Sequence, residues 1–131
     1  MRFYACIIAL TLSSPLIARA DEESPNMRLL KPAFAFHLCV ENEARVLLQS
    51  SSPKTFSSGS EAESLSEAEG WVWQRVADKC FPVLTKDEVV GMIYQNYQGN
   101  QQRMIDFRDG LLWAERAYVF AQVTDWYAAG K

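Results

Sequence analysis

Two cysteines in the body of the chain, Cys39 and Cys80, constrain its fold more than any other feature. The third, Cys6, lies in an opening segment with the order of a secretory signal: the basic Arg2, an apolar run and a small-residue pattern ending at Ala20. Cleavage after Ala20 would leave an even number of cysteines in an exported chain, for which a disulfide is the simplest arrangement. The sequence therefore predicts a Cys39–Cys80 bridge that closes a loop of about 40 residues.

Two other interpretations of the opening segment fit less well. A membrane anchor needs roughly 20 unbroken apolar residues, whereas serines and a proline at positions 13–15 interrupt this run early. Lipid modification of Cys6 would require cleavage in front of it, which would leave most of the apolar run in place. We therefore expect an exported protein with residues 1–20 as a cleavable signal and residues 21–131 as one domain without a membrane-spanning segment.

Charge and ligand count disfavour several kinds of partner. The formal net charge of −3 becomes more negative when Arg2 and Arg19 leave with the signal, so nucleic acid and anionic membranes are not expected as partners. Cys39, Cys80 and the only histidine, His37, supply at most three soft metal ligands. His37 and Cys39 are also two residues apart on a predicted helix, so they point to different faces.

Apolar residues recur at helical spacing in four segments of the chain. The first predicted helix spans roughly residues 33–49, and the second begins between residues 60 and 67 and ends at about Lys79. The third spans roughly residues 86–97 and the fourth roughly residues 101–128. The side chains expected to face inward are Phe36, Val40, Ala44 and Leu47 in the first, Leu65, Ala68, Val72 and Val76 in the second, Val89, Ile93 and Tyr97 in the third, and Met104, Phe107, Leu111, Ala114, Tyr118 and Ala121 in the fourth.

Local signals mark where these helices begin and end. Serine three residues before glutamate occurs three times between residues 60 and 69, and one of these pairs should be the capping box of the second helix. Thr85 with Glu88 is a candidate capping box for the third. The serine-rich residues 50–60 are predicted to form a flexible surface loop. In no segment do apolar and polar residues alternate clearly with the period of two that is typical of a strand. The predicted fold class is therefore all-α, a small antiparallel bundle of about four helices with one disulfide.

No pattern of catalytic residues stands out. His37 has no free thiol to activate once Cys39 is paired, and no serine lies in a recognisable nucleophile elbow. Asp106 and Asp109 are three residues apart and could form an acid pair, although their arginine neighbours make a solvated charged face the simpler interpretation. We therefore expect no catalytic residue, no cofactor and no metal.

The aromatic side chains indicate binding. Trp71 and Trp73 are two residues apart and point in nearly opposite directions on a helix, so they cannot both enter the same core. Either the second helix lies between two layers or one tryptophan, for which we choose Trp73, meets a partner. Trp113 beside Leu111 and Leu112 poses the same problem. Exposed aromatic residues favour a homodimer or a protein partner, and the alternative is that most of these residues form the core.

Several short motifs between residues 69 and 117 form a wider pattern. They are Glu69-Gly70-Trp71-Val72, Asp78, Cys80-Phe81-Pro82, Leu84-Thr85, Glu88-Val89-Val90, Tyr97, Arg103, Leu111, Leu112, Ala114 and Ala117. This pattern resembles the small periplasmic immunity proteins of type VI secretion amidase effectors, the Tai and Rap type. The chain departs from that family by lacking a further cysteine after the last helix.

The resemblance implies a periplasmic location and a function without catalysis, in which the protein, often as a dimer, occludes the active site of a peptidoglycan amidase effector. It also implies that loops and helix ends plug the toxin's cleft. By position, the best candidate is the polar turn formed by Tyr97, Gln98, Gly99, Asn100, Gln101 and Gln102, for which an ordinary interhelical turn is the alternative. Two other functions stay open: a periplasmic acid-stress chaperone of the HdeA type, whose carboxylates would titrate at low pH, and a generic binding factor for an envelope enzyme.

Overall fold

The computed structural model describes residues 25–57 and 59–130, so the expected signal at residues 1–20, with Cys6, lies outside the described part. The described residues form helices and their connections, and the all-α fold class is confirmed there. The elements are α2 (Pro25–Arg28), α3 (Leu30–Gln49), the 3₁₀-helix η1 (Pro53–Thr55), α4 (Glu61–Cys80), α5 (Pro82–Thr85), α6 (Asp87–Asn96) and α7 (Gln101–Ala129). None of these helices has the length and apolar character needed to cross a membrane.

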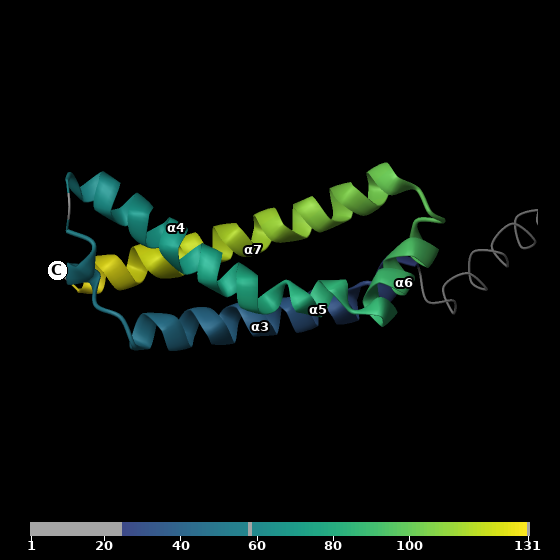
Figure 1. The fold of residues 1–131 in the computed structure, drawn as a ribbon, viewed down its shortest axis with the longest axis horizontal. Helices are drawn as coiled ribbons and strands as arrows, with labels where there is room; N and C mark the ends of the chain where they lie inside the picture. The colour runs from purple at the N-terminus through teal and green to yellow at the C-terminus, as the bar shows by residue number, and fades with distance from the viewer. Residues whose placement is uncertain (1–24, 58, 131) are drawn as a thin grey trace, which may run out of the picture.

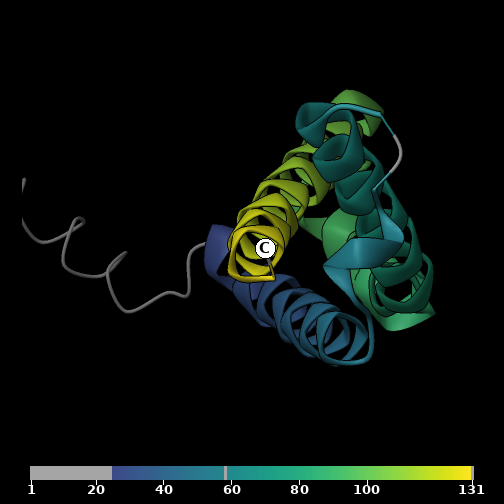
Figure 2. The same ribbon diagram turned by 90° about the vertical axis from the view of Figure 1, so that its left-hand side faces the viewer.

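Three long helices form the body of the bundle (Figure 1). Helices α3, α4 and α7 each pack against the other two, and α4 runs antiparallel to α3. The short helices α5 and α6 follow α4 at one end of the molecule, and at the other end α7 finishes beside η1 (Figures 1 and 2). The result is an elongated bundle whose polar connections lie at its two ends.

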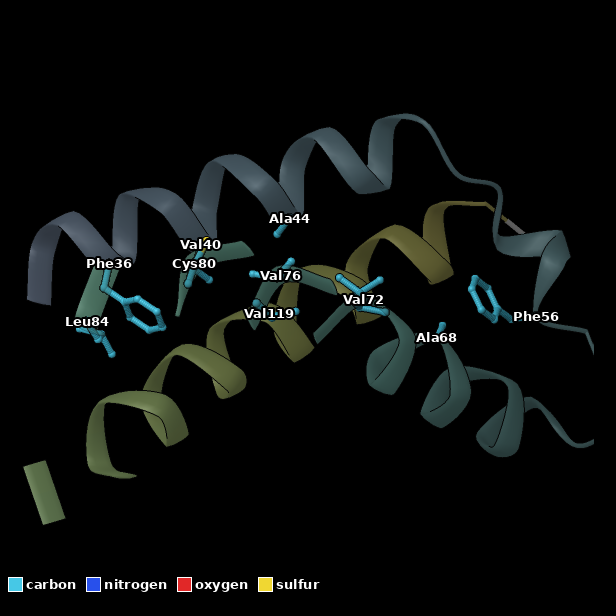
Figure 3. Packing of buried hydrophobic residues seen from close by; sticks show 11 residues of the cluster. Phe36, Val40, Ala44, Phe56, Ala68, Val72, Val76, Cys80, Leu84 and Val119 are labelled. Atoms are coloured by element: carbon cyan, nitrogen blue, oxygen red, sulfur yellow. The ribbon is translucent and has the colours of Figure 1, made fainter. Parts of the chain in front are cut away.

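The core runs along the line where the three long helices meet (Figure 3). The predicted inward stripes of α3 and α4 are confirmed for most of their members, while Leu47 and Leu65 are partly buried against the core. The buried cluster consists of Phe36, Val40, Ala44, Phe56, Ala68, Val72, Val76, Cys80, Leu84, Val119 and Val123.

The predicted disulfide is present between Cys39 of α3 and Cys80 at the end of α4. The S–S distance is 2.08 Å and the Cα atoms are 5.7 Å apart, which is ordinary geometry for a disulfide. Cys80 is completely buried in the core cluster. The bridge therefore fixes the middle of α3 against the point where the chain leaves α4 for α5.

The N-cap of α4 is one of those predicted from the sequence, whereas the N-cap of α6 is not the predicted one. Ser60 is the N-cap of α4, because its Oγ accepts a hydrogen bond from the Glu63 amide at 3.2 Å and Glu63 Oε2 accepts one from the Ser60 amide at 3.4 Å. The prediction of a capping box at Thr85 is wrong. Thr85 ends the helical turn α5, and its hydroxyl donates to the carbonyl of Pro82 at 3.3 Å. The N-cap of α6 is Lys86, which makes no capping hydrogen bond with its side chain.

The buried face of α7 differs from the predicted one. The predicted members Ala114 and Ala121 are exposed, and Met104, Phe107, Leu111 and Tyr118 are only partly buried. The buried residues are instead Glu115, Val119 and Val123, one or two positions after the predicted ones. The apolar residues of α7 are spread around the whole helix, so their spacing did not favour the correct stripe, which contains a glutamate.

The serine-rich connection between α3 and α4 contributes to the core, which the prediction of a flexible surface loop did not anticipate. Phe56 is buried there, and its ring meets those of Trp71 and Trp126 edge-on, with centroids 5.5 and 6.4 Å away. The indole nitrogen of Trp126 donates a 3.0 Å hydrogen bond to the carbonyl of Leu48. Aromatic packing thus closes this end of the bundle.

Candidate functional site

One face of α2 and α3 carries large apolar side chains that are exposed. Met27, Leu30, Phe34 and Leu38 follow one another at intervals of three or four residues, and 47–61% of each residue is exposed. This spacing places them along one side of the helix. We call these four residues the outer face of α3.

The outer face exists because α3 is apolar on two sides. Phe36 and Val40 point into the core, whereas Phe34 and Leu38, each two residues earlier, point away from it. Only the inward stripe was predicted from the sequence, although the outer residues recur with the same helical period. A contiguous exposed apolar patch on a small domain commonly marks a binding surface.

The charges near the outer face differ from those of the whole chain. Arg28 and Lys31 lie among its residues, and no acidic residue occurs from Pro25 to Val40. The first carboxylate along α3 belongs to Glu41. Lys31 also borders a hollow with Lys86 and Glu88 from the start of α6. Cations therefore outnumber carboxylates beside the outer face, which suits an apolar partner surface with an acidic edge.

The turn predicted to bind a partner connects α6 to α7. Gln98 and Gly99 have positive φ angles of 53° and 73°, and a side chain at position 99 would press against the ring of Tyr94. Asn100 caps α7 by accepting a 3.2 Å hydrogen bond from the Arg103 amide. These contacts make the turn a defined protrusion at the end of the bundle, opposite the C-terminal end of α7 (Figure 1).

The other residues predicted to bind a partner each contact different neighbours. The ring of Tyr97 packs against that of Phe107 at 5.9 Å, and the side-chain amide of Gln102 donates to Asp106 at 2.8 Å. Gln101 is exposed at the first position of α7. Trp73, which we predicted to meet a partner, lies on α4, outside this turn.

The tryptophans of α4 and α7 differ in how far they are exposed. Helix α4 packs against both α3 and α7, so Trp71 and Trp73 both lie partly buried against the core cluster. Trp113 on α7 is instead 75% exposed. The tryptophan most accessible to a partner in the described part is therefore Trp113, which spacing alone did not distinguish from its neighbours.

The single histidine joins α3 to α7. His37 Nδ1 lies 2.9 Å from both carboxylate oxygens of Glu115, and His37 Nε2 lies 3.5 Å from Glu41. Glu115 is only 6% exposed, so the imidazole supplies a buried carboxylate with the polar partner that it needs. The ring of His37 also meets that of Tyr118 edge-on at 5.1 Å.

The surroundings of Tyr118 change its titration. Burial raises the pKa of the Tyr118 phenol above its usual value of about 10, and the carboxylates of Glu41 and Glu115 raise it further, while Arg45 acts in the opposite direction. The folded protein thus holds this proton more tightly than the unfolded chain. The contribution to stability is fully present below the unfolded pKa and is lost as pH rises through the folded pKa.

Tyr118→Phe is therefore expected to weaken the alkaline destabilisation of the protein. The free energy of unfolding, measured by denaturant titration between about pH 8 and pH 11, should fall less with rising pH in the variant than in the wild type. Tyr94→Phe is a matched control, because Tyr94 is exposed on α6. Parallel pH profiles for the wild type and Tyr118→Phe would contradict the prediction.

The fold and this surface together define a class: a small all-α domain, held by one disulfide, with an exposed apolar helix face. Within residues 25–57 and 59–130, no three His, Cys, Asp or Glu side chains are grouped so that they could hold a metal ion. In comparisons with protein-family models, curated proteins and solved structures, the chain had no significant match.

Proposed function

We propose that this protein is an exported binding protein, and that it acts as an immunity protein that occludes the active site of a type VI secreted peptidoglycan amidase. The observation that carries the binding function is the outer face of α3, four large apolar side chains exposed in one row. The motifs between residues 69 and 117 support the choice of partner through their resemblance to the Tai and Rap immunity proteins. The disulfide is consistent with an oxidising compartment such as the periplasm.

A rigid platform supports this function. Three of the four residues of the outer face lie on α3, which the Cys39–Cys80 bridge fixes to α4, so their backbone is held in place before a partner arrives. Binding then costs little ordering of the backbone, which favours affinity. Phe34 lies near the middle of the row and is 61% exposed. It is the side chain best placed to act as an anchor in a pocket of the partner.

Phe34→Glu is expected to weaken binding to the amidase by about 100-fold, because it places a charge where an apolar anchor should be desolvated. The partner for this experiment is a type VI secreted peptidoglycan amidase, sought first in the reading frames beside the gene of this protein. Isothermal titration of the two purified proteins gives the affinity, and release of peptidoglycan fragments shows whether the amidase is inhibited.

Val46→Glu is the matched control, because Val46 is also half-exposed on α3 but borders a hollow beside α4. This variant should bind like the wild type. Replacing Gln98 and Gln101 by alanine tests the α6–α7 turn separately, and a loss of inhibition would support its role as a plug. Equal affinities for Phe34→Glu and the wild type would show that the outer face does not bind the amidase.

The acid-stress chaperone alternative predicts a different measurable activity. A protein of that kind would suppress the aggregation of unrelated clients at about pH 2 to 3, where carboxylates are protonated, and would show no preference for one amidase. Light scattering of acid-treated client proteins measures this property. Suppression of aggregation without amidase binding would replace our proposal by the chaperone function.

A further inference from the structure

An apolar groove lies between α5, α6 and the beginning of α7. Its cavity volume is about 370 Å³. Leu84 and Ile93 are buried where they line it, whereas Phe81, Val90 and Ile105 line it and are exposed. The groove therefore has an apolar base and an apolar edge that water reaches.

The groove opens because α7 leaves the bundle over its first turns. Arg108 and Glu115 are seven residues apart, about two helical turns, so they lie on the same side of α7. This side is buried at Glu115, where α7 packs with α3 and α4, but at Arg108 it borders the groove. The beginning of α7 diverges from α5 and α6 in both views of the fold (Figures 1 and 2).

One charged side chain gives the groove a preference for anionic ligands. Among the described residues that line it, Arg108 alone carries a charge. Its guanidinium lies 3.3 Å from the carboxylate of Asp109, the next residue, and both side chains are exposed. Such an exposed pair contributes little, so Arg108 is free to exchange this neighbour for an anionic ligand.

Three other hollows on the described surface contain carboxylates together with cations. Glu41 and Asp125 lie with Arg45 between α3 and α7, Glu43 and Asp78 lie with Arg75 and Lys79 between α3 and α4, and Glu88 lies with Lys31 and Lys86 between α3 and α6. Carboxylates at these positions would repel an anion. The groove beside α7 is distinguished by an apolar lining that contains no carboxylate and has one cation at its edge.

We propose that this groove binds a single-chain anionic amphiphile, with the hydrocarbon chain along the apolar lining and a carboxylate on Arg108. Apolar pockets of a few hundred Å³ with a small number of polar groups are typical of small-molecule sites. A volume of 370 Å³ accommodates roughly a dozen groups of the size of a water molecule. This size corresponds to a chain of about ten to twelve carbon atoms.

The dimensions favour this occupant over a helix of a protein partner. A helix with its side chains is about 10 Å wide and needs an extended groove for anchors that repeat every turn. Helix α6, which forms one wall, has only ten residues. A slender chain fits the available space, and the arginine at its edge matches a carboxylate head group.

Titration of the full chain with dodecanoate, below the concentration at which the ligand aggregates, tests the proposal. Isothermal calorimetry is expected to show saturable binding with one molecule per chain. Dodecyltrimethylammonium has the same chain length and the opposite charge, and it should bind at least tenfold more weakly. Equal binding of the two amphiphiles, or no binding of dodecanoate, would overturn the proposal.

Variants locate the binding site. Ile105→Asp should abolish dodecanoate binding, because it places a carboxylate in the apolar lining, and the 41% exposure of Ile105 favours normal folding of the variant. Arg108→Gln should weaken dodecanoate about tenfold, the loss of one charge-assisted contact, and leave the binding of neutral dodecanol unchanged. Val46→Asp, on α3 and outside this groove, is the control, and circular dichroism confirms the fold of each variant.

Two further outcomes would also overturn the proposal. Unchanged dodecanoate binding by Ile105→Asp would place the ligand elsewhere. Failure of dodecanoate to bind, together with loss of amidase binding in Ile105→Asp, would make the groove a protein interface. Amphiphile binding does not involve the outer face of α3, so the result is independent of the outcome for Phe34→Glu.

Discussion

Reduction of the Cys39–Cys80 disulfide is expected to lower the free energy of unfolding by about 4 kcal/mol. The bridge spans 41 positions in the sequence, so breaking it releases a large loop in the unfolded chain and raises the entropy of that state. A loss of this size is a large fraction of the total stability of a small domain. Guanidinium unfolding followed by circular dichroism, with and without reductant, measures the difference.

Cys39→Ser provides the control for this experiment. The variant should be about as unstable as the reduced wild type, and reductant should change its stability no further. Cys39 is the better position for the substitution because Cys80 is fully buried, where a serine hydroxyl would add its own desolvation cost. Labelling of both thiols in the native, unreduced protein would contradict the prediction.

The parts of the fold that sequence predicted are those fixed by local chemistry. Ser60 and Glu63 satisfy each other's backbone amides within one turn, and this signal can be recognised in four residues. Phe36, Val40 and Ala44 face the core because α3 needs one continuous apolar side for packing. The disulfide was predicted from the cysteine count that remains if the opening segment is an export signal.

The burial of α7 could not be predicted because it depends on residues far away in the sequence. Glu115 is an unfavourable core residue by composition, and its burial makes sense only with His37, which lies 78 positions earlier. Phe56 was missed for a similar reason. Its serine-rich neighbours indicate a loop, whereas Trp71 and Trp126 bury it.

The candidate sites also differ in whether local sequence or distant residues determine them. Residues 97–102 were chosen because a polar turn between two helices is visible in sequence, and the structure places this turn at one end of the bundle. The outer face of α3 was also encoded locally, but a helix that is apolar on two sides does not show which side stays exposed. The groove near Arg108 depends on how far α7 diverges from α6, which no local pattern specifies.

His37→Leu is expected to lower the free energy of unfolding by about 2–3 kcal/mol, because it leaves the buried carboxylate of Glu115 without its imidazole partner. Both Glu115 oxygens lie 2.9 Å from His37 Nδ1. The side chain of His37 is 33% exposed, so water that enters beside the new leucine offsets part of the penalty. Denaturant unfolding at neutral pH measures the loss.

The double variant His37→Leu, Glu115→Leu separates loss of the pair from loss of packing. An apolar pair of similar volume removes the buried charge together with its partner, so the double variant should recover most of the stability that His37→Leu loses. Glu115→Leu alone should cost less than His37→Leu, because the imidazole still lies 3.5 Å from Glu41. If the double variant were no more stable than His37→Leu, the imidazole would matter for its packing against Tyr118 and not as the partner of a buried carboxylate.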